Sequence, residues 1–281
     1  MNLRKASAAA AAVLVLSLTA TACGSGDSDS AGEEGDSGAK KITVGIKFDQ
    51  PGIGLKTPDG SFAGFDVDIA TYVAKELGYA DKDITFKETP SADRETALER
   101  GDVDFIAASY SITDERKEKV DFAGPYLLAH QDLLIRADDN IAEGSDLNGK
   151  KLCSVTGSTS AQNVKDKVAP KAQLKEYGTY SECIDGLAGG AVDALTTDDS
   201  ILAGYASQEQ NKGKFKLAGL SLSNENYGIG VKKGDTKLVD DINAALEKMV
   251  SDGAWDKAVQ DNFGPAGYKN EPAPKIGAIV S

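Results

Sequence analysis

An arginine set among acidic residues is the first feature of the sequence that suggests binding chemistry. Arg116 lies in SITDERKEKVDFAGPY, residues 111–126, in a chain whose formal net charge is -13. A planar guanidinium can meet a carboxylate with two parallel hydrogen bonds, so a well-positioned arginine suits an anionic ligand. In the run DERKEK the same residue could instead be a solvated charge, and composition alone favours that interpretation.

A short internal repeat places two polar residues at equivalent positions. LERGDVDFIAAS (98–109) and LAGGAVDALTTD (187–198) share the pattern Leu-x-x-Gly-x-Val-Asp followed by a short apolar strand. Each copy predicts a helix that stops at a glycine cap and then a strand of parallel sheet. Ser109 and Asp198 therefore stand at the carboxyl ends of equivalent strands, where open parallel sheets bind ligands. Two such units facing one another would place both residues across one cleft.

A second anion-binding element is predicted at GSTS, residues 157–160. It opens a predicted helix, and the unpaired N–H groups and positive dipole end of a helix suit an anion. The alternative is a simple N-cap, because Ser and Thr are preferred there in any case.

The elements that must position these residues form two α/β units of similar design. In the first unit, KITVGIKF (41–48) predicts a strand and FDVDIATYVAKELG (65–78) an amphipathic helix. In the second, KKLCSV (150–155) predicts a strand and SAQNVKDKV (160–168) a helix. The sequence therefore predicts an α/β protein with a parallel sheet in each unit.

The N-terminal region predicts export. Residues 1–22 combine two basic residues, an Ala/Val/Leu run and small residues before Cys23, as in a signal peptide. LTATAC resembles a bacterial lipoprotein box, in which Cys23 becomes the lipidated N-terminus; ordinary secretion with cleavage nearby is the alternative. Residues 23–40 are rich in Gly, Ser, Asp and Glu and predict a flexible tether.

The remaining cysteines, Cys153 and Cys183, are expected to pair, because an exported protein meets an oxidising environment. Two buried free thiols are the alternative. Zinc has little support, because the sole histidine, His130, has no cysteine or histidine near it at ligand spacing. We expect no metal and no cofactor, and a structural role for His130.

LERGDVDFIAASYSITDERKEKVDFAGPY, together with GSTS and VDALTTDD, resembles the extracellular solute-binding proteins of ABC transporters for polar amino acids, family 3. The similarity runs over residues 41–264, and SITDER before VDFAGPY is its most specific part. IKFDQPG, the SADR segment and the two cysteines are most similar to the glutamate-binding branch.

The resemblance implies a periplasmic-binding-protein-like α/β fold of type II, with two α/β lobes joined by two hinge strands. It places lobe 1 at residues 41–131 and 228–270, lobe 2 at 132–227, a C-terminal tail at 271–281, and the crossings near 132–136 and 226–231.

The resemblance also implies how the main-chain groups of an amino acid would be held. Arg116 would bind the α-carboxylate, with further donors from Ser109, Ser111, Ser158 and Thr159. Asp198 would accept the ammonium group. It could instead cap the turn at the end of its strand, in which case Asp199 could take the ligand.

For the ligand side chain, the resemblance points to Arg94 and Ser91 in the SADR segment, and to Lys47, which stands where some relatives carry arginine. Three cations facing two carboxylates and one ammonium fit glutamate or aspartate better than glutamine. Arg94 could instead pair with Glu95 or Glu99 on the helix surface, and Lys47 could be a solvated charge. The pocket wall is assigned to Phe48 and Tyr110, although each is of a type more often found in the core.

The predicted function is capture of glutamate outside the cell by hinge closure, and its delivery to an ABC permease and its ATPase. Aspartate, glutamine or another polar amino acid is the alternative ligand. A dehydratase-like enzyme on the same scaffold, or a sensory domain acting through a separate partner, are alternatives of other classes. The acidic balance argues against nucleic acid, membrane contact is expected only through the lipid anchor, and the resemblance implies a monomer.

Overall fold

A computed structural model of the chain describes residues 40–280. The predicted signal peptide, Cys23 and nearly all of the predicted tether therefore lie outside the described residues. Within the described range, no helix combines the length and the apolar character that crossing a membrane would require.

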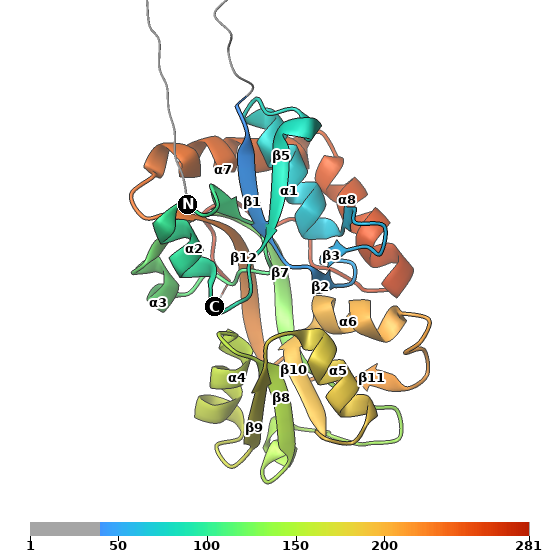
Figure 1. Cartoon of the computed structure of the whole chain (residues 1–281). Coiled ribbons are helices and arrows are strands. Elements are labelled where there is room, and N and C mark those ends of the chain that lie inside the picture. Colours follow the sequence, from blue (N-terminus) through green and yellow to red (C-terminus); the bar gives the residue numbers. More distant parts are fainter. Residues whose placement is uncertain (1–39, 281) are drawn as a thin grey trace, which may run out of the picture. The chain divides into compact units, whose positions relative to one another are not determined.

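Two α/β lobes share one nine-stranded sheet in the described residues, with the strand order β5-β1-β6-β12-β7-β10-β8-β9 and β11 paired to β7. A separate small sheet has the order β2-β3-β4. We call the β5-β1-β6 side with the small sheet the first lobe, and the β10-β8-β9 side the second lobe (Figure 1). The strands are β1 (Ile42–Ile46), β2 (Asp49–Gln50), β3 (Gly54–Lys56), β4 (Phe62–Ala63), β5 (Ile84–Glu88), β6 (Phe105–Ile106), β7 (Val120–Arg136), β8 (Lys151–Val155), β9 (Gln173–Tyr177), β10 (Ala194–Asp198), β11 (Phe215–Leu217) and β12 (Ser223–Lys232).

Helices pack against the sheet within each lobe (Figure 1). The first lobe holds α1 (Phe65–Glu76), η1 (Asp81–Asp83), α2 (Arg94–Arg100), α3 (Asp114–Lys117), α7 (Thr236–Ser251), α8 (Ala254–Phe263) and η4 (Gly264–Ala266). The second lobe holds η2 (Gly144–Leu147), α4 (Thr159–Asn163), η3 (Val164–Val168), α5 (Tyr180–Ala188) and α6 (Asp199–Ser207).

The hinge strands β7 and β12 run through both lobes. They pair antiparallel from Val120 opposite Lys232 to Gln131 opposite Ser223, with an irregularity between Tyr227 and Ile229. From Gln131 onward β7 also pairs with β10 and, further along, with β11. On its other edge β12 pairs with β6 at Gly230 and Val231. The crossings predicted at 132–136 and 226–231 lie within these two strands.

Local sequence explains where the predicted elements end. The first repeat copy stops helix α2 at Gly101, which adopts the left-handed conformation with φ 72° that glycine accommodates without a steric penalty. Helix α1 ends two residues before the predicted boundary, and Gly78 closes its last turn with φ 92°. In the second copy Gly189 is the cap but stays right-handed, and Gly190 takes the positive φ.

The C-terminal segment lies along the hinge. The Gly277 N–H donates to the Gly124 carbonyl of β7 at 2.9 Å. Val280 and the Asn226 side chain of β12 exchange two hydrogen bonds of 2.9 and 3.0 Å. The predicted tail is therefore attached to both hinge strands.

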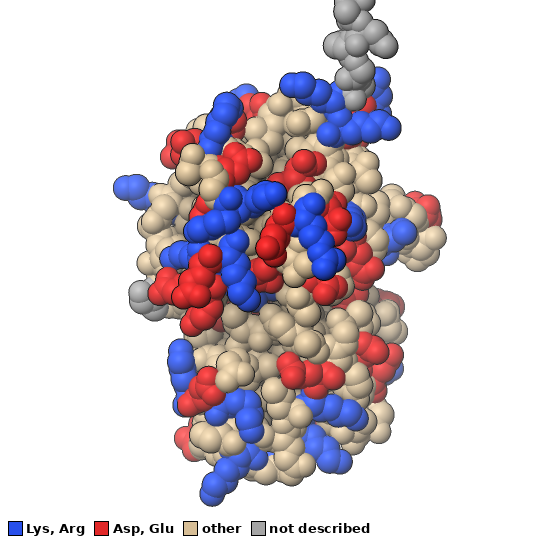
Figure 2. Space-filling view, turned by 60° about the vertical axis from the view of Figure 1, so that its left-hand side comes forward, with Lys and Arg blue, Asp and Glu red and all other residues tan. Residues whose placement is uncertain are grey.

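Charged side chains of both signs are interspersed on the face drawn in Figure 2, and a band of uncharged residues crosses its middle. The face drawn there therefore carries no one-sided basic patch of the kind that binds nucleic acid.

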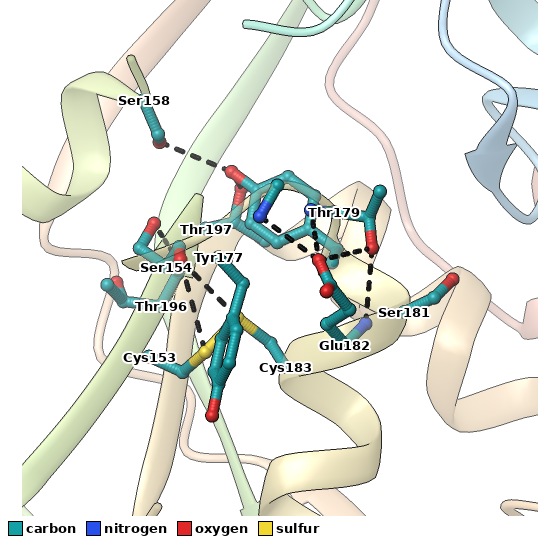
Figure 3. Close-up of a disulfide and its surroundings, with 12 residues drawn as sticks. Cys153, Ser154, Ser158, Tyr177, Thr179, Ser181, Glu182, Cys183, Thr196 and Thr197 are labelled. Carbon is teal, nitrogen blue, oxygen red and sulfur yellow. Dashed lines mark hydrogen bonds between the residues drawn. A yellow bond between two sulfur atoms is a disulfide. The ribbon is translucent and has the colours of Figure 1, made fainter. Parts of the chain in front are cut away.

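A disulfide joins Cys153 of β8 to Cys183 of α5, as predicted (Figure 3). Because the bond links a strand to the helix that covers it, it holds α5 in place within the second lobe.

Candidate ligand site

A narrow polar cavity with a volume of about 10 Å³ lies between the two lobes. Its walls come from the carboxyl ends of strands and from the starts of α2 and α4, as expected for an open α/β sheet. The lining residues are Ser91, Arg94, Ser109, Ser111, Arg116, Ser158, Thr159, Ser160, Tyr180, Thr197, Asp198 and Ile201. We call this the interlobe cavity.

Arg116 is a buried cation at this cavity, with 8% of its surface exposed, and is not the solvated charge that composition alone favoured. Its Nη1 donates to the Ser111 carbonyl at 2.8 Å, and its Nη2 donates to the Gly157 carbonyl of the second lobe at 3.1 Å. Its Nε lies 3.5 Å from the Glu95 carboxylate. The guanidinium therefore contacts both lobes directly.

Arg94 is buried more deeply, with 2% of its surface exposed, and does not lie on the helix surface. Its Nη1 donates to the Ala108 carbonyl at 2.9 Å, while Nε is buried and has no hydrogen-bond partner in the described part of the chain. Burial, and then the nearby Arg116, lowers the pKa of Arg94 to about 10. The buried, unpaired donor would be satisfied by an acceptor within the cavity.

Tyr110 lies beneath the two arginines instead of forming an aliphatic wall. Its ring centroid is 4.1 Å from the Arg94 guanidinium carbon and 5.0 Å from that of Arg116. Its hydroxyl donates to Glu95 at 2.8 Å. Cation–π contact and this hydrogen bond hold the arginines in position. Phe48 lies outside the cavity lining, where its ring packs on Phe62 with centroids 5.0 Å apart.

Lys47 follows strand β1 and does not line the cavity itself, but it contacts Ser91, which does. Its Nζ donates to the Ser91 hydroxyl at 2.8 Å, and 5% of its surface is exposed, so it is not a solvated charge. Burial lowers the pKa of Lys47 to about 7, and Arg94 contributes to the same direction. Such a perturbed group beside a cavity is typical of functional sites.

Asp198 is the buried acid on the opposite wall. Burial and the neighbouring Glu225 raise the pKa of Asp198 well above its usual value, although the Tyr227 hydroxyl donates to its Oδ2. Asp198 stands at the N-cap position of α6 but makes no side-chain cap hydrogen bond, so its carboxylate is not used as a turn cap. Asp199 is turned elsewhere, since it accepts from the His130 N–H at 3.0 Å and the Tyr268 hydroxyl at 2.9 Å.

Ser109 is held in an unusual backbone conformation, with φ 44°. Its N–H donates to Asp66 Oδ2 at 2.7 Å, and its hydroxyl donates to Gln50 at 3.1 Å. A non-glycine residue with positive φ is strained, and such strain persists where surrounding contacts enforce it. The hydrogen bond that the Ser109 N–H donates to Asp66 is one such contact.

Asp66 is a positioning residue that sequence reasoning missed. It is fully buried near the start of α1 and also accepts from the Tyr126 hydroxyl at 2.6 Å. Burial raises the pKa of Asp66 to about 6 in spite of these hydrogen bonds. The signal was present in the sequence, because Asp66 shares a helix face with the buried Ile69 and Val73.

GSTS serves both as a cap and as a cavity wall. The Ser158 hydroxyl accepts from the Ser160 N–H at 3.2 Å, which is the predicted N-cap alternative, and Thr159 lines the cavity. The Tyr180 hydroxyl donates to Ser158 at 3.2 Å and accepts from Thr197 at 2.6 Å. Tyr180 and Thr197, with Ser160 and Ile201, are lining residues that the sequence did not reveal.

His130 contributes no metal site. Its Nδ1 lies 2.9 Å from the Asn224 side-chain oxygen and its Nε2 lies 3.6 Å from Glu271. No cluster of His, Cys, Asp and Glu among the described residues could hold a metal ion.

The amino-acid sequence of the chain matches the model of a known family. The model of the bacterial extracellular solute-binding proteins, family 3, covers residues 42–265. The chain belongs to this family. Its members are the extracellular solute-binding components to which the sequence motifs pointed, so the predicted family is confirmed.

Individual relatives are similar to this chain in sequence, and a solved structure is similar to it in fold. The chain is 50% identical over 234 residues to the glutamate-binding protein GluB of Corynebacterium efficiens, covering 79% of each chain. It is 43% identical over 219 residues to the ABC transporter glutamine-binding protein GlnH of Bacillus subtilis, covering 77% of this chain and 79% of that protein. A solved structure of an ancestral arginine-binding protein bound to glutamine matches with a TM-score of 0.74 and 38% identity, covering 80% of this chain and 98% of that chain. The type II fold with two lobes and two hinge strands is thereby confirmed.

Proposed function

We propose that the protein captures glutamate outside the cell and delivers it to an ABC permease and its ATPase. The observation that carries this proposal is the burial of three cations, Lys47, Arg94 and Arg116, on one side of a small polar cavity, with Asp198 on the other. The 50% identity to a glutamate-binding protein supports the same ligand.

Charge balance favours an amino acid with two carboxylates. Burial, and secondly the neighbouring arginine in each case, lowers the pKa of Lys47 and of Arg94, so keeping both groups charged is unfavourable without an anion nearby. Glutamate would bring one carboxylate to Arg116 and one to the neighbourhood of Arg94 and Lys47, while its ammonium would neutralise Asp198. A neutral side chain would leave the second cationic group without a counter-charge.

Capture is proposed to proceed by hinge closure, with β7 and β12 as the hinge. Arg116 and Arg94 belong to the first lobe, whereas Thr159 and Asp198 belong to the second, so a ligand in contact with both sets stabilises the closed form. We propose lobe boundaries at 41–131 with 228–270 and at 132–227, with residues 271–281 as a tail.

Attachment to the membrane is proposed to use the lipidated Cys23 after removal of residues 1–22, with residues 23–40 as a tether. The family is extracellular, which agrees with this route. We further propose that the protein is a monomer that acts without a cofactor.

A ligand panel tests the assignment. The protein is heated with glutamate, aspartate, glutamine or arginine, and the shift in Tm is compared, because a ligand that binds only the folded state stabilises it. Glutamate should give the largest shift and glutamine a small one. A larger shift with glutamine or arginine would overturn the glutamate assignment while leaving the binding function in place.

Glutamine is the second candidate ligand, because GlnH of Bacillus subtilis is 43% identical to this chain. An enzymatic role is the candidate of another class, and we propose that the protein is not an enzyme, since the relatives found are solute-binding proteins. NMR of glutamate incubated with the protein should show unchanged ligand; appearance of a product would contradict this proposal.

A further inference from the structure

Asp49 forms a contact between the lobes that is separate from the ligand cavity. It lies in β2 of the first lobe and is not a lining residue. Its Oδ2 accepts from the Tyr180 N–H at 2.9 Å and from the Ser181 N–H at 3.4 Å, both in α5 of the second lobe. The Tyr205 hydroxyl of α6 donates to the Asp49 carbonyl and lies 3.1 Å from its Oδ2.

The start of α5 needs such an acceptor. Its own capping box uses Thr179 and Glu182: the Glu182 N–H donates to the Thr179 hydroxyl, and the Thr179 N–H donates to the Glu182 carboxylate (Figure 3). The capping box does not use the N–H groups of Tyr180 and Ser181. These two groups donate hydrogen bonds to Asp49 instead. A carboxylate is also favoured at the positive end of the helix dipole. The first lobe therefore completes the cap of a helix in the second lobe.

This contact is coupled to the cavity through Tyr180. The Tyr180 backbone meets Asp49, while its side chain lines the cavity between Ser158 and Thr197. Cys183, one turn further along α5, is bonded to Cys153 of β8, which keeps the helix start in a constant position (Figure 3). The contact with Asp49 and the wall of the ligand site therefore share one residue, Tyr180.

The same region shows an unusually close approach of the two lobes. A Cβ atom on Gly204 of α6 would lie 2.0 Å from the Pro51 carbonyl oxygen of the first lobe. Real Cβ atoms do not come so near another atom, so this approach requires glycine. The substitution Gly204→Ala should therefore block closure of the lobes, and Gly204 does not line the cavity.

The geometry points to Asp49 as a positioning residue for ligand capture: its carboxylate latches the lobes together and sets how long the ligand is retained. This inference rests on the proposed hinge closure but does not depend on which amino acid is bound. The latch forms only when the lobes meet, so it affects the rate at which the ligand dissociates. The ligand associates with the open form, so the association rate does not depend on the latch.

The test compares Asp49→Ala and Tyr205→Phe with wild type by stopped-flow fluorescence, using glutamate and glutamine as probes. We expect about a tenfold faster dissociation for Asp49→Ala, which loses charge-assisted hydrogen bonds, with little change in the association rate. Tyr205→Phe should show a smaller effect. The ratio of the two affinities should not change, because Asp49 does not line the cavity. Asp59→Asn, an exposed acid of the same lobe, is the charge-matched control.

A second measurement tests the latch independently of which amino acid the protein binds. Spin labels on the two lobes report their distance in ligand-free and in glutamate-saturated protein for wild type, Asp49→Ala and Gly204→Ala. We expect longer distances in both variants, with the larger change in Gly204→Ala. Identical distances in all three proteins, or an unchanged dissociation rate in Asp49→Ala, would overturn the latch. A panel in which glutamine binds best would overturn the glutamate assignment and leave the latch standing.

Discussion

Lys47 makes glutamate binding depend on pH in a way that can be worked out from the structure. Its pKa is lowered to about 7, first by burial and then by Arg94, so a large part of the population is neutral near neutral pH. A carboxylate of the ligand placed near Lys47 favours the charged amine and raises that pKa. Binding should therefore take up a proton, and the affinity should fall as the pH rises above 7.

The magnitude follows from the fraction of protein that carries the charged amine. With a pKa of about 7, that fraction falls from about nine-tenths at pH 6 to about one-tenth at pH 8. The dissociation constant should rise by the inverse of that fraction, which is about tenfold, or about 1.4 kcal/mol. At pH 7 about half a proton should be taken up for each ligand bound.

Isothermal titration calorimetry measures both quantities. The dissociation constant is determined between about pH 6 and 8, a range in which the carboxylates of glutamate stay ionised. Proton uptake is obtained by repeating the pH 7 titration in buffers of different ionisation enthalpy. Lys47→Met is the control, because it keeps an aliphatic chain of similar length without the titrating amine; its affinity should fall less with pH than that of wild type, the remaining dependence coming from Asp66 and Asp198. A constant affinity and no proton uptake in wild type would refute the reasoning.

Three further changes test the site and the scaffold. Arg116→Ala should weaken glutamate binding by roughly 2 to 5 kcal/mol, because a buried carboxylate loses its partner; a calorimetric loss below threefold would show that Arg116 is not the anchor. Arg94→Met should reduce the preference for glutamate over glutamine, and an unchanged ratio of the two affinities would remove Arg94 from the side-chain site. Replacing Cys153 and Cys183 together by alanine should lower the free energy of unfolding by roughly 3 to 4 kcal/mol in urea titrations, because the unfolded chain gains freedom. A much smaller change would mean that packing alone holds α5 on β8.

The interior of each lobe could be predicted because its signals are local. The repeat around Gly101 and Gly189 encodes a helix stop followed by a strand, and both copies form as expected. In strand β1 the apolar Ile42, Val44 and Ile46 alternate with Thr43 and Gly45, which is the period-2 pattern of a strand. Periodicity and turn chemistry act over a few residues, so such elements are visible without any tertiary information.

The residues of the candidate site could be predicted where they belong to a sequence motif of the family. Ser91, Arg94, Arg116 and Asp198 belong to segments that resemble the family, and the structure brings them into one cavity. Phe48 lies one residue after Lys47, yet it packs on Phe62 outside the cavity, because side chains alternate in direction along an extended segment.

The amino-acid sequence by itself determined the strands, the helix stops, the disulfide partners and the charges available for a ligand, since each depends on residue type and short-range spacing. Only the tertiary structure decided that Asp66 positions Ser109, that Tyr110 supports two arginines, and that Asp49 caps a helix 131 residues further along the chain. Those contacts depend on sheet register and on the approach of the two lobes. No local pattern specifies either, because both arise from packing between segments far apart in the chain.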